Sequence, residues 1–106
     1  MIKRFLFSLF LLLSLNSFGQ QVALVHINAD FNKSNDWYGL TIVEGCNVYS
    51  GNLDKNPPLK NKHDITRVPT LILYVNGKEE ERWEASLDMK IHADVKEVQK
   101  TIDRYK

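Results

Sequence analysis

Two continuous apolar runs dominate the hydrophobic pattern of this 106-residue chain downstream of its N-terminus. Gln21–Asn28 (QVALVHIN) and Thr70–Val75 (TLILYV) have the length and β-branched content of strands that are buried on both faces. Asn76-Gly77 directly follows the second run and is typical of a type I′ hairpin turn, because both central residues of that turn need φ above zero. The more polar segment Lys78–Glu84 then returns as the second strand of the hairpin.

The remaining segments alternate between helical spacing and one further strand. Apolar residues at helical spacing predict a helix over about 35–44, and Asn47–Leu53 is interpreted as a strand. A capping residue before Pro57 predicts a short helix over about 54–63. A last helix should begin after Asp94, where Glu97 would complete a capping box. The expected order is β-α-β-α-β-β-α, an α/β protein with a four-stranded mixed sheet.

The segment around the second buried strand resembles that of a known family. Ile65–Leu71 (ITRVPTL), followed by Tyr74–Lys78 (YVNGK), is similar to the cis-proline strand and hairpin of the thioredoxin superfamily. Pro69 marks the beginning of the strand, because a central strand cannot hold a proline. The resemblance covers nearly all of the chain after residue 20. It implies a minimal thioredoxin-like fold that lacks the additional N-terminal strand and helix of many thioredoxins.

The resemblance also locates the family's redox motif, which this chain lacks. Where the family carries Cys-x-x-Cys, the sequence has Asn32-Lys33-Ser34-Asn35, so both cysteine positions hold asparagine. His26 aligns with the family's buried acidic residue. Disulfide exchange needs a thiolate nucleophile and a second thiol, and asparagine supplies neither. We therefore expect no catalytic residue in this degenerate loop and no thioredoxin-type disulfide oxidoreductase activity.

The N-terminus has the pattern of an export signal. Lys3 and Arg4 precede the apolar run Phe5–Leu15, which is short for a membrane span and is followed by small residues. We expect a secretory signal peptide over 1–20 and a mature thioredoxin-like domain over 21–106 that is periplasmic or secreted. Such a domain would not stay inserted in a membrane after cleavage. An uncleaved N-terminal anchor is the alternative.

Charge and ligand spacing exclude several classes of partner. The 14 basic and 13 acidic side chains give a net charge of +1, which becomes −1 once the two basic residues near the N-terminus are removed. Nothing in that balance indicates nucleic acid. The three histidines, His26, His63 and His92, and the single cysteine do not show metal-ligand spacing. We expect no metal and no cofactor.

A lost dithiol beside a retained proline loop predicts a non-enzymatic module that binds an extended or unfolded polypeptide or a protein partner. In the family, the residue before the cis-proline, here Val68, offers backbone groups to an extended peptide. Trp37 could equally line this surface or pack against the sheet. The expected binding residues are Phe31, Asn32, Asn35, Trp37, Val68 and Pro69.

Two other functions stay open at this point. A single-thiol redox protein or sensor would act in cell redox homeostasis through Cys46, the only cysteine. The position of Cys46 outside the site loop, with Glu44 nearby, favours instead a buried structural thiol. The third possibility is a structural subunit that assembles through the edge strands of its sheet.

Overall fold

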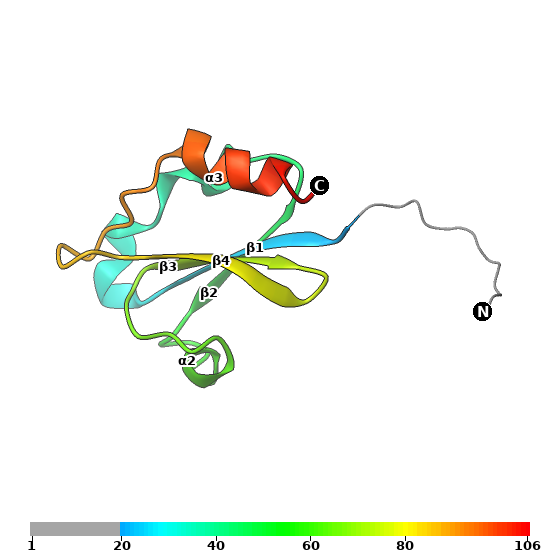
Figure 1. The fold of residues 1–106 in the computed structure, drawn as a ribbon. Coiled ribbons are helices and arrows are strands. Elements are labelled where there is room, and N and C mark those ends of the chain that lie inside the picture. Colours follow the sequence, from blue (N-terminus) through cyan, green and yellow to red (C-terminus); the bar gives the residue numbers. More distant parts are fainter. Residues whose placement is uncertain (1–19) are drawn as a thin grey trace, which may run out of the picture.

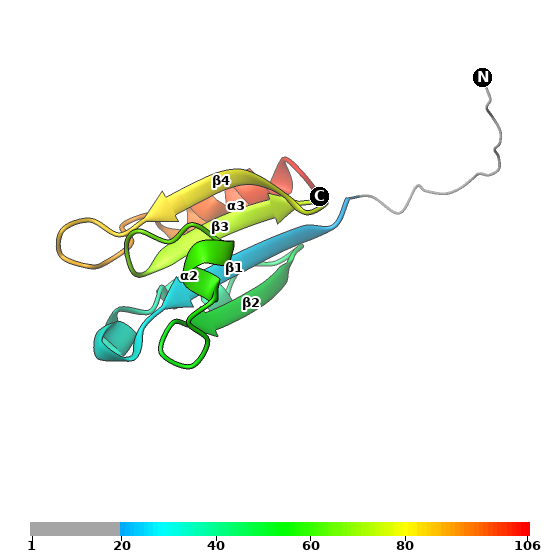
Figure 2. The same ribbon diagram turned by 90° about the horizontal axis from the view of Figure 1, so that it is seen from below.

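The computed structural model describes residues 20–106, so the predicted signal peptide lies, except for Gln20, outside the described residues. The sheet has four strands: β1 (Val22–Asn28), β2 (Asn47–Asn52), β3 (Thr70–Val75) and β4 (Lys78–Glu84). Their order is β2-β1-β3-β4, with β1 parallel to β2 and antiparallel to β3, and with β3 antiparallel to β4 (Figure 2). This confirms the predicted α/β class and the four-stranded mixed sheet.

The two faces of the sheet are covered unequally. Helix α3 (Val95–Asp103) and the segment that follows β1 lie over one face, whereas only α2 (Leu59–Lys62), a single turn, lies over the other (Figures 1 and 2). Alternating residues of β1 and β3 point to opposite faces, so each face has its own core. The α3-side core consists of Val22, Leu24, Trp37, Val43, Leu71, Leu73, Val75, Ile91, Val98 and Ile102, and the α2-side core of Ile27, Ile65 and Ile72.

The α-helix predicted over 35–44 is wrong. Two short 3₁₀ segments, η2 (Asp30–Asn35) and η3 (Tyr38–Thr41), occupy this part of the chain, and the backbone between them is extended at Trp37 (φ −65°, ψ 125°). The Trp37 N–H donates to Nε2 of the buried His26 at 3.1 Å. That N–H therefore cannot enter a helical hydrogen-bond ladder, and the helix is interrupted there.

The indole of Trp37 fixes the next turn of the chain. Its ring lies in the α3-side core, 3 % exposed, and its Nε1–H donates to the Ala93 carbonyl oxygen at 2.8 Å. Gly39 packs directly beneath this ring, and a Cβ at position 39 would fall against the indole carbon atoms. A glycine at this position lets the chain turn closely around the tryptophan.

The two remaining helices lie where the sequence predicts them, but the first of them is shorter than predicted. The α-helical part of the predicted 54–63 helix is only Leu59–Lys62, preceded by turns over 53–58. The last helix begins after Asp94 as predicted, and the Glu97 N–H donates to Asp94 Oδ1 at 2.8 Å. The Glu97 carboxylate accepts a hydrogen bond from Trp83 Nε1–H at 3.2 Å. Within residues 20–106, no helix is long and apolar enough to cross a bilayer.

Candidate functional site

Three stretches of chain meet at one end of the sheet. They are η2 after β1, the Val68–Pro69 loop before β3 and the segment 85–90 after β4, and the last of these lies near η2 in both ribbon views (Figures 1 and 2). Pro69 is buried and the Val68–Pro69 peptide bond is cis. The loop at the position of the family's redox motif therefore lies beside the proline loop, as the resemblance implies.

Asn32 joins these three stretches through its side-chain amide. The residue is 4 % exposed and interrupts η2, with φ −115° and ψ 17°. Its Nδ2 donates to the Met89 carbonyl oxygen at 3.1 Å, and to the Val68 carbonyl oxygen and Asn28 Oδ1 at 3.3 Å each. Its Oδ1 accepts from Asn35 Nδ2 at 2.7 Å. The first asparagine of the degenerate loop is thus a buried crosslink and offers no group for chemistry.

Asn28, the last residue of β1, completes the network. Its Nδ2 donates to the Asn32 carbonyl oxygen at 3.0 Å and to Asp36 Oδ1 at 2.7 Å. In every contact of this network a side-chain amide N–H donates to a carbonyl or carboxylate oxygen. Because buried polar groups are costly unless they are paired, the network stabilises the end of the sheet where it lies.

His26 lies behind this network, between Ser50 and Asp36. Its Nδ1 is 3.4 Å from Ser50 Oγ, and its Nε2 is 3.9 Å from Asp36 Oδ1. Because Nε2 accepts the Trp37 N–H, the proton of the neutral ring is on Nδ1, which faces the serine. A histidine in that tautomer cannot take the serine proton. The three residues therefore lack the arrangement of a serine–histidine–aspartate catalytic triad. Burial lowers the pKa of His26, and Asp36 opposes this shift only in part.

Two large apolar side chains are exposed on the stretches that form the site. Phe31 is 72 % exposed and Leu87, on the segment that contacts Asn32 through Met89, is 95 % exposed. Val68 is half-buried, and its N–H makes no hydrogen bond to another of residues 20–106. Sequence reasoning missed Leu87, for which the only signal is one large apolar residue in a polar connection.

Three of the other four predicted binding residues are buried, and the fourth is half-buried. Trp37 packs in the α3-side core. Asn32 and Pro69 are buried, and Asn35 is half-buried against Asn32. The structure therefore places Phe31, Leu87 and Val68 where a partner could touch them.

Cys46 lies far from this end of the sheet. It precedes β2, whose first residue pairs with Ala23 at the start of β1, whereas the site loop follows the end of β1. A seven-residue strand separates the two by roughly 20 Å. The thiol is half-buried against the α3-side core, and this burial raises its pKa despite the nearby Lys106. A thiol with a raised pKa is mostly protonated at neutral pH and a poor nucleophile.

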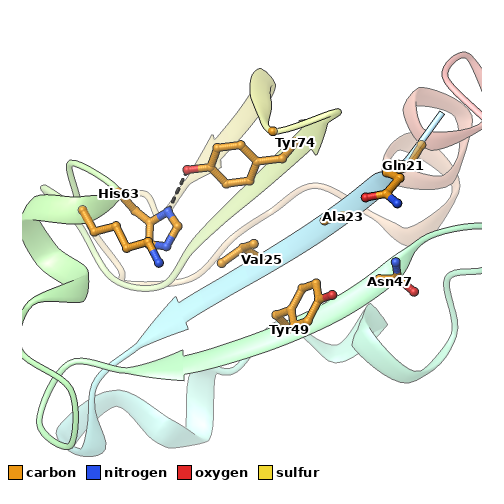
Figure 3. A pocket seen from close by; sticks show the side chains of 10 residues that line it. Gln21, Ala23, Val25, Asn47, Tyr49, His63 and Tyr74 are labelled. Carbon is orange, nitrogen blue, oxygen red and sulfur yellow. Dashed lines mark hydrogen bonds between the residues drawn. The ribbon is translucent and has the colours of Figure 1, made fainter.

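A hollow lies on the other face of the sheet, beside α2. Its volume is about 430 Å³, and Tyr49, Val25 and Tyr74 lie across three neighbouring strands of its floor, with His63 near one end (Figure 3). His63 Nδ1 is 2.7 Å from the Tyr74 hydroxyl. Burial lowers the pKa of His63, aided by Lys62, and burial raises the pKa of Tyr74. None of the predicted site residues lines this hollow. Residues 20–106 hold no group of three or more His, Cys, Asp or Glu side chains that could bind a metal.

Comparison with known proteins shows the fold. Neither protein-family models nor curated proteins match the sequence. Among solved structures, an N21Q mutant thioredoxin from Halobacterium salinarum NRC-1 is similar at 21% identity and TM-score 0.63, over 80% of this chain and 74% of that chain. Schistosoma mansoni thioredoxin is similar at 17% identity and TM-score 0.62, over 84% of this chain and 81% of that one. Fasciola hepatica thioredoxin is similar at 18% identity and TM-score 0.57, over 81% of this chain and 82% of that chain. The chain thus has a thioredoxin-like fold with one cysteine.

Substitution of Asn32 tests its role as a crosslink. Asn32→Ala should lower the free energy of unfolding by about 1–3 kcal/mol, because the Val68 and Met89 carbonyl oxygens lose a buried donor. The isosteric Asn32→Asp should cost more at pH 7, since it directs a carboxylate at three acceptor oxygens. Asn35→Ala, which removes one hydrogen bond, should cost less than either. Urea denaturation measures all three, and equal losses for all three would contradict the crosslink.

The lowered pKa of His26 predicts an acid-labile fold. The unfolded chain binds a proton near pH 6.5 that the folded chain resists, so stability is full above pH 6.5 and falls below it. Below pH 6.5 the loss due to His26 should reach up to about 1.4 kcal/mol per pH unit. His26→Gln should flatten this slope more than His63→Gln, whose ring is less buried. Urea denaturation at several pH values checks this, and a slope unchanged in His26→Gln would refute it.

Proposed function

We propose that this thioredoxin-like protein is a non-enzymatic module that binds an extended segment of polypeptide at a surface formed by Phe31, Val68 and Leu87. The observation that supports this most strongly is the position of Val68. Its N–H has no acceptor within residues 20–106, and it lies beside a buried proline. The Asn32 amide joins Val68 to the two stretches that carry the exposed Phe31 and Leu87. Such a surface offers backbone pairing and apolar contact without a reacting group.

The backbone of Val68 suits an extended partner. The N–H can donate to a carbonyl oxygen of the partner, and the Val68 carbonyl oxygen, which already accepts from Asn32, keeps a second lone pair. Backbone pairing of this kind gives affinity with little dependence on the partner's sequence. Phe31 and Leu87 would add apolar contact on either side, and they would favour partners with large apolar residues.

The hydrogen bonds of the buried Asn32 amide support the proposal of a binding function without catalysis. It holds the site loop, the Val68 loop and the Met89 segment in one arrangement, so the surface is formed before a partner arrives. A surface that needs no rearrangement loses less entropy on binding. The single cysteine lies at the far end of β1 with a raised pKa, which counts against redox chemistry at this surface.

The binding proposal is tested by panning a phage library of extended peptides on the purified protein and measuring the affinity of a selected peptide by calorimetry. Phe31→Ser and Leu87→Ser should each weaken binding at least about tenfold, since each removes an exposed apolar contact. Ile42→Ser is the matched control, because Ile42 is also exposed but lies beside α3. Failure to select any peptide, or equal affinity in all variants, would overturn the proposal.

Export is part of the same proposal, and it rests on the basic and apolar pattern of residues 1–20. N-terminal sequencing of the protein that the producing cell accumulates should begin at Gln20 or Gln21. It should appear in the periplasmic or culture fraction. Protein that retains Met1 and sediments with membranes would instead indicate an uncleaved anchor.

A further inference from the structure

The two edges of the sheet differ sharply in charge. In β4, six of the seven residues (KEEERWE) are charged, and its pairing with β3 is irregular at Leu73/Tyr74. Charges and irregularities are the usual protection of an edge strand against pairing with another strand. In β2, the six residues NVYSGN include no charge and no proline, so the second edge has none of these features.

The β2 edge also exposes apolar side chains on both faces of the sheet. Tyr49 is 56 % exposed and Val48 is also exposed, and neighbouring residues of a strand point to opposite faces. Within residues 20–106, β2 pairs only with β1, so the outer backbone groups of β2 have no strand partner. Those N–H and C=O groups are the template to which another strand would add.

The open face of the sheet continues to this edge. Tyr49 forms part of the floor of the 430 Å³ hollow, in line with Val25 and Tyr74 (Figure 3). Because α2 has only four residues, it leaves this part of the face uncovered. A strand added beside β2 would extend the floor of the hollow, and its side chains would cover Tyr49.

We propose that the strand added to β2 is β2 of a second copy of this chain, antiparallel about a two-fold axis at Tyr49. The resulting dimer has one continuous eight-stranded sheet. An uncharged strand meets an identical uncharged strand, so the pairing brings no repulsion. The two Tyr49 rings lie next to each other on the open face, and each Val48 lies opposite a Ser50 on the other face. The same contact between two β4 strands would gather the carboxylates of four glutamates from each copy.

The dimer is independent of the proposed polypeptide-binding surface. Val68 precedes β3, and the strand order β2-β1-β3-β4 puts β3 on the opposite side of β1 from β2. Pairing through β2 therefore leaves Val68 uncovered, whereas Phe31 follows Asp30, which accepts a hydrogen bond from Asn52 at the end of β2. One strand pair with two aromatic side chains is a small interface, below about 1,200 Å² in total, which is the size of weak, transient contacts.

Sedimentation velocity of the purified protein, over a concentration series from about 10 µM to 1 mM, tests the dimer. The unaltered protein should shift from monomer to dimer across this range. Tyr49→Lys should weaken association at least tenfold because it places two ammonium groups side by side, and so should Tyr49→Glu. A mixture of these two variants should recover association through opposite charges. Glu81→Lys on β4 is the control and should associate as the unaltered protein does.

A crosslinking experiment gives a second readout that does not depend on the charged variants. In a Cys46→Ser background, Tyr49→Cys should form an intermolecular disulfide under mild oxidation, whereas Glu81→Cys should form far less. A protein that stays monomeric up to 1 mM would overturn the proposal. So would association that is unchanged in Tyr49→Lys, or a β2 edge that pairs with another polypeptide and not with itself.

Discussion

The side-chain amide of Asn32 lies where three separate stretches of chain meet, and its hydrogen bonds join the loop after β1 to the Val68 and Met89 carbonyl oxygens. With a single cysteine, no disulfide within the chain can link these stretches. The amide is buried, so its bonds are protected from water, and each acceptor that it satisfies would otherwise be a costly unpaired group. The arrangement of the chain on either side of Val68 therefore depends in part on this one side chain.

The sequence predicts the sheet better than the first helix, and the reason is visible in particular residues. The strands of the sheet follow from continuous apolar runs and from Asn76-Gly77, which take φ values of 53° and 82° in the turn. The helix over 35–44 was inferred from the spacing of Trp37, Leu40 and Val43. All three do pack in or against the core, so the pattern identified burial correctly. It could not identify the hydrogen bond from Trp37 to His26, eleven residues away, that changes the backbone.

The sequence predicts the candidate site only in outline, because its details depend on residues that are far apart in the chain. The resemblance placed Asn32 beside Val68, but whether an asparagine is buried or exposed depends on which carbonyl groups converge on it from distant parts of the chain. Met89, 57 residues further on, is one of them. Leu87 and the hollow beside His63 were missed because neither has a local sequence pattern. Both arise where segments that are distant in sequence meet, or where a short α2 leaves a face uncovered.

The absence of thiols and the absence of a long helix at this site fit together physically. A cysteine becomes a good nucleophile when it is accessible and when a helix N-terminus or a cation lowers its pKa. A long helix supplies such a field because its peptide dipoles add along the axis. Here the chain after β1 forms a six-residue 3₁₀ segment that is interrupted at Asn32, and position 32 is buried beneath the Val68 and Met89 carbonyl groups. Carbonyl oxygens directed at this position favour a hydrogen-bond donor and disfavour an anion. The local structure is therefore suited to an amide, and a thiolate at the same position would lack both the access and the electrostatic support on which its reactivity depends.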